Sequence, residues 1–123
     1  MALLKYDNYP NGKVKVLCGG ILISKWHILT AALCIENRAD VGKNNTLNDN
    51  HICAEGSDIK HSCKGDSGGP IFYVHKFTGP DTYRYVQYGV TSTGGDLCGK
   101  TKKQMEIFTS VISMLPWITQ NVL

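Results

Sequence analysis

The sequence predicts an all-β domain that ends in one short helix. Short runs rich in Leu, Ile, Val and aromatic residues recur along the chain, separated by Gly, Pro, Asn and Asp. The C-terminal residues Ser113–Leu123 carry the pattern of an amphipathic helix instead. The length of 123 residues is enough for one small domain with a modest core. Complete all-β barrels often need roughly 200–250 residues, so this chain is short for that class.

The N-terminal part contains four expected strands, at Ala2–Tyr6, Lys13–Leu17, Gly20–Ile23 and His27–Ala31. The segment Asn8–Gly12 has the residues of a turn, which predicts a hairpin between the first two strands. The polar stretch Glu36–Asn50 is expected to be a loop.

The C-terminal part contains three further expected strands, at Ile71–His75, Tyr83–Ser92 and Glu106–Thr109. Turn residues at Thr78–Asp81 predict a connection between the first two of these. In the closing helix, Ser113 is the candidate N-cap, and Pro116 is tolerated if it lies in the first turn.

Composition narrows the classes of partner and compartment. The net charge of +3 is too small to indicate a nucleic acid or an anionic membrane as a partner. No stretch approaches the roughly 18 apolar residues of a membrane span. Lys5 and Asp7 interrupt the first ten residues, so we expect no signal peptide there. The five cysteines nevertheless suit an oxidising compartment, and no motif indicates a metal or another cofactor.

The hexapeptide Gly65-Asp66-Ser67-Gly68-Gly69-Pro70 is the most specific motif of the chain. A serine is a weak nucleophile until a base activates it, and glycines let backbone N–H groups approach a developing oxyanion. This hexapeptide resembles the nucleophile loop of the trypsin/chymotrypsin-like (S1) serine proteases. The resemblance implies that Ser67 stands at the nucleophile position. It also implies that the N–H groups of Gly65 and Ser67 form the oxyanion hole.

Two upstream segments, Cys18–Ser24 and Ile28–Cys34, resemble the part of the same family that carries the catalytic histidine. At the histidine position this chain has Leu33, whose side chain cannot accept a proton. Nothing between Cys34 and Cys53 matches the family segment that carries the catalytic aspartate. Within the family, the N-terminal part most resembles secreted arthropod proteases of clotting and immune cascades, which implies an extracellular location.

The resemblance implies an incomplete chymotrypsin-like Greek-key double barrel with a short C-terminal helix. We expect a single partial S1 domain over residues 1–123. Residues 1–35 are a remnant of the first barrel, about 36–50 hold the seam, and 51–123 are a remnant of the second barrel with the helix. In an alternative arrangement, the retained strands of both halves close into one hybrid barrel.

The cysteines fit the same resemblance. It implies two disulfides, Cys18–Cys34 and Cys63–Cys98, and leaves Cys53 as a free thiol. The family partner of Cys53 belongs to the segment that is absent here. An intermolecular bridge or a reactive thiol is the functional alternative for this cysteine.

The expected substrate pocket departs from the family pattern. The resemblance assigns it to His61, Ser92, Thr93, Gly94 and Glu106. His61 lies where trypsin-like members carry an aspartate that pairs with Lys or Arg side chains. Glu106 replaces a glycine that keeps the pocket open, and it is expected to intrude and to pair with His61.

Three functions remain open from the sequence. The first is a catalytically inactive protease homologue that binds a polypeptide substrate or a protein partner of a protease cascade. The second is an incomplete product of an active secreted serine endopeptidase. The third is a small disulfide-bonded interaction module.

The resemblance also implies an activation pairing between a terminal amine and Asp66. We expect this pairing to lack its partner, because this sequence starts beyond the place of that amine.

Overall fold

The computed structural model describes residues 1–6, 15–35, 48–55, 62, 66–92 and 105–122. The first sheet is antiparallel and has the order β1-β2-β3. Its strands are β1 (Ala2–Tyr6), β2 (Lys15–Leu22) and β3 (Ile28–Leu29), and the 3-10 turn η1 (Ala32–Cys34) follows. The antiparallel pairing of β1 with β2 agrees with the expected hairpin, although its turn lies outside the described residues.

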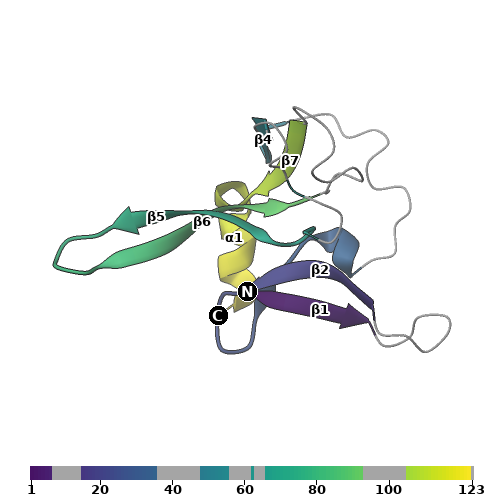
Figure 1. Cartoon of the computed structure of the whole chain (residues 1–123), viewed down its shortest axis with the longest axis horizontal. Coiled ribbons are helices and arrows are strands. Elements are labelled where there is room, and N and C mark those ends of the chain that lie inside the picture. Colours follow the sequence, from purple (N-terminus) through teal and green to yellow (C-terminus); the bar gives the residue numbers. More distant parts are fainter. Residues whose placement is uncertain (7–14, 36–47, 56–61, 63–65, 93–104, 123) are drawn as a thin grey trace.

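The second sheet is also antiparallel and has the order β4-β7-β6-β5. It consists of β4 (His51–Glu55), β5 (Pro70–Lys76), β6 (Tyr83–Thr91) and β7 (Met105–Ser110). The helix α1 (Val111–Val122) follows β7 directly. Figure 1 shows the β5–β6 hairpin projecting away from the rest of the chain, with α1 between the two sheets. The all-β class with a C-terminal helix is confirmed.

Several expected boundaries were wrong. Residues Lys15–Leu22 form one continuous strand instead of two, because Gly19 and Gly20 extend β2. The expected strand at His27–Ala31 shrinks to the two residues of β3. The helix begins at Val111, so Pro116 lies inside it. Ser113 also lies within the helix, where its hydroxyl donates to the Asp49 carbonyl at 3.1 Å and does not cap the first turn.

The described strands form two sheets, so the hybrid barrel is not the arrangement found. The two sheets meet at the loop between Asp66 and Pro70. There the Gly19 N–H in β2 donates to the Ser67 carbonyl at 2.8 Å. This contact brings together the two segments that carry the chemical motifs of the sequence.

The core of the described residues is small. Four apolar side chains are buried: Cys18, Cys34, Val90 and Phe108. No residue of α1 is buried, and Trp117 on this helix is 61% exposed. Since burial of apolar surface is the main favourable term in folding, few side chains carry the stability of this chain. Within the described part of the chain, no helix has the length and apolarity that a membrane crossing requires.

Candidate functional site

The Ser67 loop is held between the two sheets by backbone hydrogen bonds. The Ser67 carbonyl accepts from Gly19 in β2, as described above. On the other side, the Gly68 N–H donates to the Thr91 carbonyl at 2.7 Å, and the Thr91 N–H donates to the Gly69 carbonyl at 2.8 Å. The Gly69 N–H closes the turn by donating to the Asp66 carbonyl at 2.9 Å. The position of Ser67 therefore depends on both sheets.

Gly68 in this loop cannot be replaced by another amino acid without strain. Its φ angle is 81°, in the left-handed region that favours glycine. A Cβ atom there would fall within 3.0 Å of both the Thr30 hydroxyl and the Gly19 carbonyl oxygen. The Thr30 hydroxyl donates to that same carbonyl at 2.8 Å. The glycine thus permits close contact between the loop and the first sheet.

Leu33 lies next in sequence to a residue that contacts the Ser67 backbone. Cys34 forms a disulfide with Cys18, as the resemblance implies. The Cys34 Sγ lies 3.6 Å from the Ser67 carbonyl oxygen, a contact without a proton because the sulfur is part of the disulfide. Leu33 is half-buried in η1. An aliphatic side chain thus occupies the segment that meets the serine, and its role as a replacement for the base stays a prediction.

The three described histidines are each hydrogen-bonded to a residue other than Ser67. His27 Nδ1 shares a hydrogen bond of 2.7 Å with the Ser24 hydroxyl. His51 Nδ1 accepts from the Asn48 N–H at 3.2 Å. His75 Nε2 shares a hydrogen bond of 2.6 Å with the Tyr88 hydroxyl. None of these bonds directs an imidazole to Ser67, which itself is only 8% exposed.

The expected pocket segments converge in part. Glu106 is buried in β7 and accepts a hydrogen bond from the Ser62 N–H. The Ser92 N–H donates to the Ile107 carbonyl at 3.2 Å, which places the end of β6 beside Glu106. Glu106 and Ser62 line a cavity of about 340 Å³ together with Asp66. His61, Thr93, Gly94 and Gly65 lie outside the described residues, and so does the expected Cys63–Cys98 disulfide.

Asp66, the residue before Ser67, lies at the surface. Its side chain is exposed, and it takes part in an interaction within the chain. The cost of burying an unpaired carboxylate therefore does not arise here. The free thiol of Cys53 is exposed on β4.

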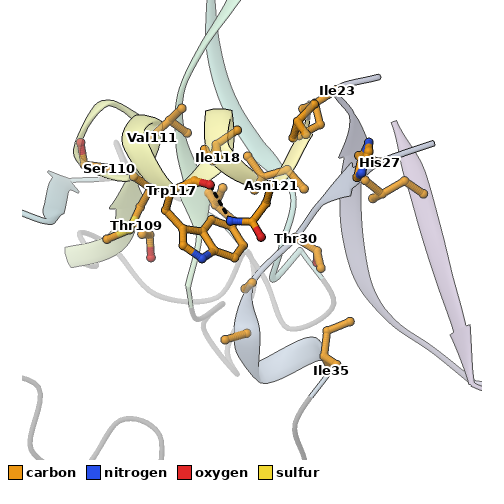
Figure 2. A pocket seen from close by; sticks show the side chains of 17 residues that line it. Ile23, His27, Thr30, Ile35, Thr109, Ser110, Val111, Trp117, Ile118 and Asn121 are labelled. Atoms are coloured by element: carbon orange, nitrogen blue, oxygen red, sulfur yellow. Dashed lines mark hydrogen bonds between the residues drawn. The ribbon is translucent and has the colours of Figure 1, made fainter. Parts of the chain in front are cut away.

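Sequence reasoning missed a larger apolar groove of about 590 Å³. The groove lies between α1 and the segment from Ile23 to Ile35 of the first sheet. Figure 2 shows the Trp117 and Ile118 side chains on one side of it, and Thr30 and Ile35 on the other. The apolar face of the expected helix was the available signal. Nothing in the sequence showed that this face lies across a groove from η1.

Comparison with known proteins places this site in a family. The family model described as Trypsin matches residues 38–118. That range contains Ser67 and Glu106 and begins after Leu33. More than half of the chain is covered.

Curated relatives point the same way. The chain is 44% identical to phenoloxidase-activating factor 3 of Holotrichia diomphalia over 79 residues, 64% of this chain and 21% of the relative. It is 37% identical to phenoloxidase-activating enzyme of Bombyx mori over 81 residues, 66% and 17% of the two chains. Serine protease grass of Drosophila melanogaster is 34% identical over 71 residues, 58% and 19% of the two chains.

The chain thus spans about a fifth of the length of these relatives. No solved structure matches it significantly. Its open antiparallel sheets and short closing helix are consistent with part of a chymotrypsin-like fold. The match over residues 38–118 establishes that the chain belongs to the trypsin family of serine proteases.

Proposed function

We propose that this chain is a catalytically inactive member of the trypsin family that binds a polypeptide through its protease-like surface. The observation that carries the proposal is the contact between Ser67 and the segment of Leu33. The sulfur of Cys34, the residue after Leu33, lies 3.6 Å from the Ser67 carbonyl oxygen. A leucine in this segment supplies no base for the serine hydroxyl.

The size of the expected defect is large. Removal of the histidine from a serine protease triad costs on the order of 10⁶ in turnover. This factor corresponds to about 8 kcal/mol of transition-state stabilisation. The described histidines offer no replacement, because their hydrogen bonds to Ser24, Asn48 and Tyr88 direct none of them to Ser67. Binding of a polypeptide does not require a base that takes the proton of the serine hydroxyl, so it can persist when catalysis is lost.

The proposed partner is a protein of an extracellular protease cascade. Two relatives are named for the activation of phenoloxidase, and a third is named a serine protease. Residues 1–35 would be what remains of a first barrel, and residues 51–123 what remains of a second. In this proposal, His61, Ser92, Thr93, Gly94 and Glu106 line the substrate side, and no metal or cofactor takes part.

Labelling of Ser67 tests the proposal directly. The chain should neither hydrolyse peptide esters nor react with an organophosphonate, while an active trypsin-family protease in the same assay does both. The variant Leu33→His should stay inactive, because no segment matching the catalytic aspartate region is present to orient a new histidine. Rapid stoichiometric labelling that disappears in Ser67→Ala would overturn the proposal.

A second candidate is an incomplete form of an active secreted endopeptidase. The small number of buried apolar side chains among the described residues favours this second candidate. A complete fold would cover more of the large apolar side chains that are exposed here. The full transcript distinguishes the two candidates. A longer message that carries an intact histidine segment supports the second candidate, and a message that encodes Leu33 supports the first.

A further inference from the structure

The strand β4 forms one edge of the four-stranded sheet. In the order β4-β7-β6-β5, its neighbour among the described residues is β7 alone. Figure 1 shows β4 beside β7, and the strand order places it at the opposite edge of this sheet from β5. An edge strand presents backbone N–H and C=O groups that can pair with a strand of another chain.

The hydrogen bonds around β4 show which of its residues face outward. The Ser110 N–H donates to the Asn50 carbonyl at 2.8 Å, directly before β4 begins. Bonded and non-bonded pairs alternate along an antiparallel ladder, so the even-numbered residues of β4 bond to β7. The odd-numbered residues, with Cys53 at the centre, therefore direct their backbone groups away from β7. Of these groups, the His51 N–H already donates to the Asn48 carbonyl at 3.0 Å. The residue opposite Cys53 agrees with this pattern. Ile107 of β7 directs its carbonyl away from β4, where it accepts a hydrogen bond from the Ser92 N–H.

The sequence of β4 complements itself in the antiparallel direction. If two copies align with Cys53 opposite Cys53, then His51 of each copy lies opposite Glu55 of the other. Ile52 then lies opposite Ala54, so both apolar residues are matched as well. Such an arrangement has two-fold symmetry, in which the same patch serves both partners.

The side chains of these residues suit the pairing. His51, Cys53 and Glu55 alternate onto one face of the sheet. The Nδ1 atom of His51 accepts a hydrogen bond from Asn48, so the neutral ring carries its proton on Nε2 and donates from there. Glu55 is exposed and has interactions within its own chain, and a carboxylate accepts several hydrogen bonds. Cys53 is exposed and small, so it does not obstruct a second strand.

We propose that two copies of this chain associate through β4, in a symmetric antiparallel pairing centred on Cys53. The two central Cα atoms then lie about 5.5 Å apart, as in a hydrogen-bonded antiparallel pair. The contact is non-covalent and joins the two four-stranded sheets into one. This association does not depend on whether the Ser67 site is active.

A proline at the centre of β4 tests the pairing. The reference is Cys53→Ser, which removes the thiol and with it any adventitious disulfide but keeps the backbone N–H. The variant Cys53→Pro removes that outward N–H and leaves the bonds to β7 in place, and proline is tolerated on edge strands for this reason. Sedimentation velocity over a concentration series should show a monomer–dimer equilibrium for the serine variant and monomer for the proline variant. Circular dichroism checks that both variants retain the same strand content.

Charge exchange in the Cys53→Ser background tests the register. The added change His51→Glu places like charges opposite one another twice in the dimer. Cross-strand pairs of this kind should raise the dissociation constant about 2- to 30-fold. Adding Glu55→Lys to that variant should restore the affinity, because opposite charges then face each other. A monomeric serine variant, a dimer that survives the proline or a charge exchange without recovery overturns the proposal.

Discussion

Gly68 offers the sharpest test of how the Ser67 loop is held. The change Gly68→Ala adds one methyl group to a residue whose φ angle is 81°. The added carbon would fall within 3.0 Å of the Thr30 hydroxyl and of the Gly19 carbonyl oxygen. It would also lie 3.2 Å from the Ala31 backbone nitrogen. Two of these three neighbours are backbone atoms, one in β2 and one in the residue before η1, and they cannot rotate away.

The expected loss of stability has two parts. An alanine in the left-handed region costs about 1–2 kcal/mol. Forced overlap in a packed region typically costs a further ~1–3 kcal/mol. The free energy of unfolding should therefore fall by about 2–5 kcal/mol. Small domains have roughly 5–15 kcal/mol in total, so this loss is a large fraction.

Urea unfolding of the complete chain measures the effect, and Gly79→Ala is the matched control. Gly79 also has a positive φ, 116°, but a Cβ atom there would meet only Thr82, at 3.6 Å. The control thus carries the backbone cost without the overlap. Equal losses in the two variants would refute the idea that the loop is pressed against the first sheet. A larger loss at Gly68, or complete loss of its cooperative transition, supports it.

Three further predictions concern the core and the exposed surface. Phe108→Ala should lower the free energy of unfolding by about 3–5 kcal/mol, because this ring is only 4% exposed. In contrast, Phe72→Ala should cost less than Phe108→Ala, because the Phe72 ring is 52% exposed and its edge-on contact is with the exposed Tyr85. Urea titration of both variants checks the difference. Replacing Cys18 and Cys34 by alanine should lower the free energy of unfolding by about 3 kcal/mol, because the disulfide spans a sequence separation of 16. Thermal unfolding measures this loss. Both tryptophans are more than half exposed, so their emission maximum should shift little on unfolding, and a large red shift would show that α1 is covered.

The sequence predicted strands best where β-branched and aromatic residues are frequent. The β-branched and aromatic runs gave β5 and β6 to within one or two residues. The glycines of β2 were interpreted as a break, yet they continue the strand. A Cβ at Gly20 would fall 2.7 Å from Ile28 Cγ2, so glycine serves the close approach of β3 there. Local sequence cannot reveal a contact of this kind.

The strand β4 shows the same limit. His51–Glu55 is short and flanked by polar residues, and its only described partner is β7, far along the chain.

For the site, the hexapeptide around Ser67 and the cysteine pair were visible as motifs. The positions of Leu33 and Glu106 relative to them depend on how two sheets meet. The apolar groove along α1 depends on the same packing, so no sequence pattern could reveal it.

The bonds that fix the Ser67 loop have a consequence for the order of folding. Gly19 donates to Ser67 across a long sequence separation, while Gly68 and Thr91 join the loop to the second sheet. Contacts between distant residues form slowly, because the entropy of closing the intervening loops must be overcome first. The loop that carries the family signature should therefore acquire its geometry late in folding.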